Sequence, residues 1–244
     1  MSEKENIMSQ KKRKNRNKSG KMEAPKPSTL FTLIEPNSSI SEQFRTIRTN
    51  IQYSQLGKQT KSVAITSAGP SEGKSTTAAN LAVMFAKLGL KTLLVDADMR
   101  RPTAHLTFEL DKGVGLSNLL SLKQLSVSEV VQETNIPYLD VMTSGIRVPN
   151  PSELLASPRM KKLISVLDEL YDFVIFDMPP ASTVTDVQLV SPHLDGVVVV
   201  VRKEVTDKKA LNRSIYLLDK VDTTILGCVY LDKVEVNYTD YYYS

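Results

Sequence analysis

The chain of 244 residues is 41% hydrophobic and 24% charged, a composition typical of folded globular proteins that excludes whole-chain disorder and fibrous repeats. Its length predicts one α/β domain with terminal tails. The formal net charge of +4 is uneven, because residues 1–30 contain nine Lys and Arg against three Asp and Glu, whereas residues 31–244 are slightly acidic. No apolar run approaches the length of a membrane-spanning helix, and residues 1–30 lack the apolar core of a secretory signal. We therefore expect a cytoplasmic protein.

Residues 1–30 form a basic segment in which Lys and Arg lie among Asn, Ser and Gly, with almost no apolar side chains. This composition predicts disorder. The segment is either a solubilising tail or a region attracted to anionic lipid and other polyanions. Specific binding of nucleic acid is not expected.

The predicted elements alternate along the rest of the chain. An amphipathic helix over residues 40–51 comes first. Short apolar or β-branched runs then predict strands at residues 62–67, 92–95, 139–142, 173–176, 197–201 and 225–231, most of them followed by a helical stretch. Runs without polar alternation suit strands that are buried on both faces. The pattern predicts a doubly wound, mostly parallel sheet with helices on both faces, formed by residues 31–232.

The strongest motif lies between the strand at 62–67 and a helical stretch at 77–88. It reads AGPSEGKST from Ala68 to Thr76, which is the context and pattern of a P-loop except that Ala68 stands where the general pattern has Gly. Backbone amides of such a loop bind phosphates, its Lys neutralises β and γ oxygens, and its Ser binds Mg²⁺. The predicted ATP-binding residues are Gly69, Pro70, Ser71, Glu72, Gly73, Lys74, Ser75 and Thr76.

Carboxylates follow two further buried strands. Asp96 and Asp98 end the run at 92–95, and Asp177 ends the run at 173–176. Each one alone would most simply cap the next turn. If the strands are parallel neighbours in one sheet, however, all three carboxylates converge on the phosphates. Asp177 could then hold Mg²⁺, while Asp96 or Asp98 orients a nucleophile.

Tyrosines gather at the end of the chain. Tyr238, Tyr241, Tyr242 and Tyr243 occupy four of the last seven positions, although the chain has nine Tyr in all. An aromatic tail that docks in a partner's groove would usually bring aliphatic anchors as well. Residues 233–244 are therefore predicted to be a flexible tail of acceptor hydroxyls.

Together these motifs resemble the bacterial tyrosine kinases (BY-kinases) that control capsule and exopolysaccharide synthesis. The shared motifs are the P-loop, LLVDADMRRP at 93–102, FVIFDMPP at 173–180, the terminal tyrosines, NPSELL at 150–155 and the EQFRTIR helix at 42–48. The resemblance covers residues 30–244. It implies an autophosphorylating protein-tyrosine kinase that uses ATP and Mg²⁺ and transfers the γ-phosphate to tyrosines of a neighbouring subunit and of other proteins.

The resemblance also assigns roles to residues. Lys74, Asp96 and Asp98 are expected to be catalytic, with Asp96 as the base toward the tyrosine hydroxyl, and the metal ligands would be Ser75, Asp98 and Asp177. A ring of subunits would be held through Glu42, Arg45 and Arg48, although an exposed helix with internal ion pairs explains that pattern equally well. The kinase would be recruited to the inner face of the cell membrane by a separate transmembrane activator protein.

Two other functions fit parts of the sequence. A partitioning or cell-division ATPase of the related P-loop group would bind membrane or DNA, but it carries a Lys where this chain has Gly69. A catalytically silent scaffold is disfavoured by the intact Lys and Asp residues. His105, His193 and Cys228 have no metal-ligand spacing, and Cys228 is expected to be a small buried strand residue.

Overall fold

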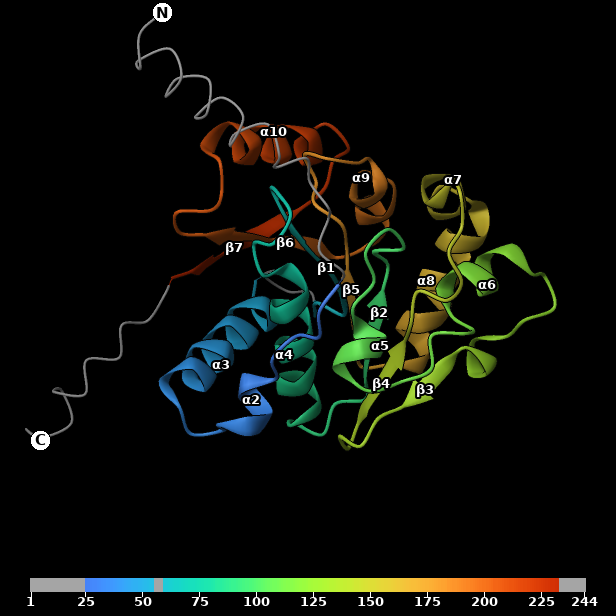
Figure 1. Cartoon of the computed structure of the whole chain (residues 1–244), viewed down its shortest axis with the longest axis horizontal. Helices are drawn as coiled ribbons and strands as arrows, with labels where there is room; N and C mark the ends of the chain where they lie inside the picture. Colours follow the sequence, from blue (N-terminus) through green and yellow to red (C-terminus); the bar gives the residue numbers. More distant parts are fainter. Residues whose placement is uncertain (1–24, 55–58, 233–244) are drawn as a thin grey trace, which may run out of the picture.

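The computed structural model describes residues 25–54 and 59–232. A seven-stranded sheet with the order β3-β4-β2-β5-β1-β6-β7 forms its centre (Figure 1). All neighbouring strands are parallel except β3, which pairs antiparallel with β4. The strands are β1 (Ser62–Ser67), β2 (Thr92–Asp96), β3 (Val131–Glu133), β4 (Leu139–Met142), β5 (Phe173–Asp177), β6 (Gly196–Arg202) and β7 (Ile225–Leu231).

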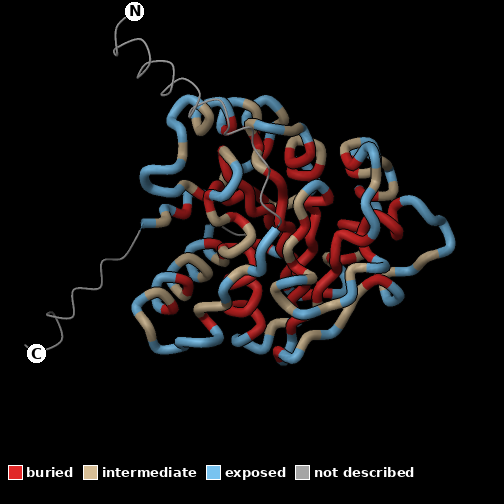
Figure 2. Tube along the Cα trace, in the orientation of Figure 1, coloured by how far each residue is buried: buried red, intermediate tan, exposed pale blue. Residues whose placement is uncertain are grey.

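Helices cover both faces of the sheet. One core cluster joins the sheet to the helices α3 (Ser39–Gln52), α4 (Lys74–Ala86) and α5 (Ala104–Thr107), with α2 (Phe31–Ile34) packed against α3 and α4. A second cluster lies on the opposite face, and Figure 2 shows the buried strands between the two layers. Its helices are α6 (Leu116–Ser121), α7 (Pro151–Leu155), α8 (Pro158–Leu170), α9 (Asp186–Val190) and α10 (Lys208–Asp219).

Local sequence explains where the longer helices begin. Ser38, Ser157 and Asp207 each accept a hydrogen bond from a backbone N–H in the first turn of α3, α8 and α10 respectively, which satisfies one of the unpaired amides at a helix start. Helix α4 begins directly after Gly73 and is buried along most of its length. Its small residues let it lie close to the sheet, where Phe85 stacks on Phe173 with ring centroids 3.6 Å apart.

The parallel sheet with helices on both faces is confirmed, as are the six strands predicted from the sequence. The short β3 was missed because its three residues, VQE, carry no apolar run. The expectation that Cys228 is buried is wrong, since β7 lies at the edge of the sheet and leaves this side chain exposed. Within the ranges described, no helix is long and apolar enough to cross a membrane.

The packed region begins before residue 31. Ser28 and Thr29, which the sequence places in the basic tail, make hydrogen bonds to α5 and α4. The domain boundary expected at residue 30 therefore falls inside a packed segment. Residues 1–24 and 233–244, including the four terminal tyrosines, lie outside the described residues.

Candidate active site

The P-loop connects β1 to α4 at the carboxyl end of the central strands. Gly73, the last residue before the helix, has a φ of 95°, and a Cβ atom there would lie 2.5 Å from Leu231 Cδ1. Only glycine satisfies both the left-handed conformation and this close approach. Ser71 also has a positive φ of 62°. The loop backbone is thus folded tightly around the start of α4, where unpaired amides and the helix dipole favour an anion.

Side chains from three elements hold the loop backbone in place. The buried Glu72 carboxylate accepts a 3.0 Å hydrogen bond from the N–H of Ala68. Ser182 Oγ donates to the Ala68 carbonyl over 2.6 Å, and Arg202 Nη1 at the end of β6 donates to the Ser71 carbonyl over 3.1 Å. Glu72, which the sequence predicted to bind ATP, therefore bonds to its own loop.

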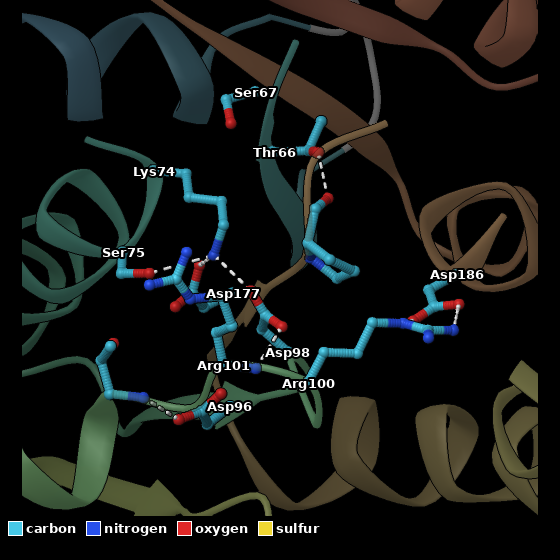
Figure 3. A network of polar contacts seen from close by, with 12 residues as sticks. Thr66, Ser67, Lys74, Ser75, Asp96, Asp98, Arg100, Arg101, Asp177 and Asp186 are labelled. Atoms are coloured by element: carbon cyan, nitrogen blue, oxygen red, sulfur yellow. Dashed lines mark hydrogen bonds and ion pairs between the residues drawn. The ribbon is translucent and has the colours of Figure 1, made fainter. Parts of the chain in front are cut away.

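Lys74 lies between two carboxylates, Asp177 at the end of β5 and Asp98 in the segment after β2 (Figure 3). Its Nζ is 2.8 Å from Asp98 Oδ2 and 3.5 Å from Asp177 Oδ1, and it donates to Ser75 Oγ over 3.2 Å. Burial lowers the pKa of Lys74, but the charges of Asp177 and Asp98 outweigh this effect and raise it. The ammonium group is thus charged at neutral pH, as phosphate neutralisation requires.

Asp96 lies beside this cluster and is fully buried. Its Oδ2 accepts 2.9 Å hydrogen bonds from the N–H groups of Thr103 and Ala104, and its Oδ1 has no hydrogen-bond partner among the described residues. Burial and the nearby charge of Asp177 raise the pKa of Asp96 to about 7. A carboxylate with this pKa is suited to accept a proton at neutral pH.

Three carboxylates therefore meet as the sequence predicted. Asp96 and Asp177 are register partners on the parallel neighbours β2 and β5, and Asp98 follows β2 by two residues. Burial also raises the pKa of Asp177, although the charge of Lys74 opposes this.

The chemistry of Ser75, Asp98 and Asp177 fits Mg²⁺. Magnesium prefers oxygen ligands and is usually held by one or two carboxylates together with substrate phosphates and water. In the part of the chain that the structure describes, no group of three or more His, Cys, Asp and Glu side chains is arranged as a metal site by itself. The hydroxyl and two carboxylates could therefore supply the few protein ligands that such a site needs.

A cavity of about 510 Å³ opens beside the P-loop. The cationic side chains of Lys26, Lys74, Arg101 and Arg202 line it, and Asp98 is the one carboxylate among its lining residues. This charge balance favours a polyphosphate. The remaining lining residues are Pro25, Pro27, Ser28, Pro70, Ser71, Gly73, Ser75, Thr76, Thr103 and Pro180.

Six of the eight predicted ATP-binding residues line this cavity, whereas Gly69 and Glu72 do not. The sequence analysis assigned no role in the site to Lys26, Arg101 or Arg202. The position of Arg202 at the carboxyl end of β6 is a signal that could have identified it, because ligands bind beyond that end of parallel strands. Lys26 carries no such signal, since it lies among other basic residues upstream of the first helix.

A second ion pair supports the loop that carries Asp98. Arg100 donates from Nε and Nη2 to the two carboxylate oxygens of Asp186 over 3.0 and 3.1 Å, and Ser152 Oγ donates to Asp186 Oδ1 over 2.6 Å. Asp186 is completely buried. This network joins the segment after β2 to α7 and α9, and Figure 3 shows it to one side of the Lys74 cluster.

The predicted oligomer contacts all lie on α3. Arg45 forms an ion pair with Glu42 one turn earlier and donates to the Pro36 carbonyl over 2.7 Å. Arg48 is partly buried and donates to the Met84 carbonyl over 3.3 Å, near the end of α4. Within one chain, therefore, Glu42 and Arg45 form the exposed intrahelical pair, and Arg48 joins two helices.

Comparison with known proteins identifies relatives of the whole domain. The family model for the AAA domain matches residues 60–226. The tyrosine-protein kinase YwqD of Bacillus subtilis (strain 168) is 46% identical over 214 residues, which make up 88% of this chain and 90% of the relative. The putative tyrosine-protein kinase CapB of Staphylococcus aureus is 40% identical over 216 residues, 88% of this chain and 94% of the relative.

Solved structures agree with these relatives. The chimerical protein CapA2B2 matches with a TM-score of 0.79 and 42% identity, over 85% of this chain and 92% of that one. The kinase domain of the Escherichia coli tyrosine kinase ETK matches with a TM-score of 0.80 and 28% identity, over 94% and 90%. The septum site-determining protein MinD of Pyrococcus horikoshii shares the fold, with a TM-score of 0.60 at 22% identity. The chain therefore belongs to the bacterial tyrosine kinases of the capsular and exopolysaccharide biosynthesis family, and it is a P-loop protein-tyrosine kinase.

Proposed function

We propose that this kinase transfers the γ-phosphate of ATP to the tyrosines of residues 238–243 in a neighbouring copy and to tyrosines of other proteins. The arrangement of Lys74 between Asp98 and Asp177, with the buried Asp96 beside it, carries this proposal. The same cluster contains a phosphate-binding cation, oxygen ligands for Mg²⁺ and a carboxylate that can take a proton. The concentration of tyrosines at residues 238–243 supports the choice of acceptor.

The binding step follows from the cavity. Amides of the P-loop and the start of α4 bind the phosphates, and Lys74 leaves its contacts with the carboxylates to neutralise the β and γ oxygens. Ser75, Asp98 and Asp177 would hold Mg²⁺, which supplies charge neutralisation at the phosphates when it is bound. Arg202 donates a hydrogen bond to the Ser71 carbonyl and adds a positive charge to the cavity lining.

The transfer step needs a base because a tyrosine hydroxyl has a pKa near 10 and is a weak nucleophile at neutral pH. Asp96 accepts the hydroxyl proton, and the phenolic oxygen forms a bond to the γ-phosphorus. The bond between that phosphorus and the β–γ bridging oxygen breaks, and ADP leaves with the electron pair. Asp98 is the alternative base, since it lies in the same segment and lines the cavity.

The kinase acts in polysaccharide synthesis, on the inner side of the cell membrane, as a ring-forming homo-oligomer that a separate membrane protein activates. The family and the acceptor segment support this setting. Phosphorylation adds about −1.5 to −2 charges to each tyrosine. Several phosphates in residues 238–243 would therefore repel one another and loosen a ring in which each tail occupies the next site.

Intact mass measured after incubation with Mg²⁺ and ATP tests this proposal. We expect stepwise additions of phosphate that map to Tyr238, Tyr241, Tyr242 and Tyr243, and more of them in the presence of the cytoplasmic segment of a candidate membrane partner than in its absence. Lys74→Met should show no addition, because it removes the cation that binds the phosphates. An unchanged mass with steady consumption of ATP would contradict the kinase and favour the partitioning-type ATPase.

A further inference from the structure

The segment from Pro25 to Ile34 runs along α4, the helix that begins at the P-loop; its first part is the blue chain leading into α2 in Figure 1. We call residues 25–32 the strap. It lies upstream of residues 60–226, the region that the AAA family model matches.

Asn80 of α4 anchors the strap through both ends of its side-chain amide. Its Oδ1 accepts 3.0 Å hydrogen bonds from the N–H and the hydroxyl of Thr32, and its Nδ2 donates over 2.8 Å to the Thr29 carbonyl. Asn80 and Thr32 are both completely buried. The strap thus has a defined docking site two turns from the P-loop.

A second set of contacts joins the strap to the catalytic segment. Ser28 N–H donates to Thr107 Oγ1 of α5 over 2.9 Å, and Thr76 Oγ1 in the first turn of α4 donates to Ser28 Oγ over 3.4 Å. The first turn of α5 donates its amides to Asp96. The strap therefore bridges the phosphate-binding helix and the helix that Asp96 holds.

The strap also forms one wall of the nucleotide cavity. Pro25, Lys26, Pro27 and Ser28 all line it, opposite residues of the P-loop. Lys26 brings a cation to a cavity that already contains Lys74, Arg101 and Arg202. The two prolines restrict the backbone on either side of Lys26, which lowers the entropic cost of holding the Lys26 backbone at the cavity.

We propose that the strap is part of the nucleotide-binding site: Lys26 binds the polyphosphate of a purine nucleotide, and the Asn80–Thr32 contacts hold the strap in the position that allows this. Nucleotide binding and strap docking are then coupled, because each stabilises the other. This inference rests on the nucleotide binding that the proposed kinase activity requires.

Titration of the full chain with a fluorescent MgADP analogue tests the role of Lys26. We expect Lys26→Ala to raise the dissociation constant at least about tenfold, the loss typical of one charge-assisted contact. Lys26→Arg should restore most of the affinity, since it keeps the charge. Lys161→Ala, which removes an exposed cation of α8 outside the cavity, is the matched control and should bind as the original chain does.

Hydrogen exchange of the same samples tests the coupling. MgADP should slow the exchange of amides in residues 26–34. Thr32→Val should weaken this protection and should raise the dissociation constant of MgADP about threefold, while the amides of α4 stay protected. Unchanged affinity in Lys26→Ala, or strap amides that exchange equally fast with and without MgADP, would overturn the inference. If the original chain itself bound no MgADP, the proposed function would fail together with it.

Discussion

Asp96 is a fully buried carboxylate whose burial opposes its charge. Its pKa rises from 3.8 to about 7 on folding, so the unfolded chain loses this proton at a lower pH than the folded chain does. The contribution of Asp96 to the free energy of unfolding therefore falls as pH rises between about 4 and 8. We expect nucleotide-free Asp96→Asn to match the original chain near pH 4 and to gain up to about 4 kcal/mol relative to it at pH 8. Urea unfolding across this range measures the difference, and a difference independent of pH would contradict the account.

The catalytic roles of Asp96 and Asp98 can be separated because only Asp98 lies within 3 Å of Lys74 Nζ. Asp96→Asn should slow single-turnover phosphate transfer by about a hundredfold or more, the usual contribution of a general base, and change MgADP affinity little. Asp98→Asn should change both, since it alters a predicted Mg²⁺ ligand and the charge beside Lys74. Transfer that survives in Asp96→Asn and is lost in Asp98→Asn would assign the base to Asp98.

Among the elements, α7, α9 and the segment after β2 depend on the buried Asp186. Its partner Arg100 is 39% exposed at the side chain, whereas Asp186 is completely buried. We expect Asp186→Asn to destabilise the fold by about 1–3 kcal/mol, because the charge-assisted bonds from Arg100 are weakened in a buried setting. Chemical denaturation measures this loss.

The exposed pair of Lys203 and Asp232 provides the matched control. Its two side chains are 49% and 41% exposed, and solvent screens such pairs strongly. Lys203→Met should leave the denaturation midpoint unchanged. If both substitutions shifted the midpoint equally, the structural role given to Asp186 would be wrong.

At the scale of the whole molecule, assembly is proposed to depend on α3. Glu42 and Arg45 have side chains that are 62% and 37% exposed, so exchanging their intrachain pair for contacts with another copy costs little. We expect the double substitution Glu42→Ala, Arg45→Ala to shift the full chain toward monomer in mass photometry without lowering its thermal stability. Arg48→Ala should reduce stability as well, because Arg48 also binds the Met84 carbonyl.

The parts of the fold that could be predicted from the sequence are those in which a local run of apolar residues coincides with a buried element. Strands such as β1 and β5 contain short apolar runs and are buried along their whole length, and the P-loop motif located the start of α4 to within a few residues. The convergence of Asp96, Asp98 and Asp177 followed once parallel strands were assumed. In contrast, the strap has no periodic pattern of apolar residues. Its position depends on the hydrogen bond between Thr32 and Asn80, which are 48 positions apart in the chain. Contacts of that kind are set by tertiary packing and cannot be read from neighbouring residues.

Phosphate transfer between copies is the central claim. It is tested directly by mixing a catalytically inactive chain with a chain that lacks the acceptor tyrosines. One chain carries Lys74→Met with its tyrosines intact, and the other has an intact site with Phe at Tyr238, Tyr241, Tyr242 and Tyr243. After addition of Mg²⁺ and ATP, intact mass should show phosphate on the Lys74→Met chain only in the mixture. If that chain stays unmodified in the mixture while the original chain phosphorylates itself, transfer to a neighbouring copy is contradicted.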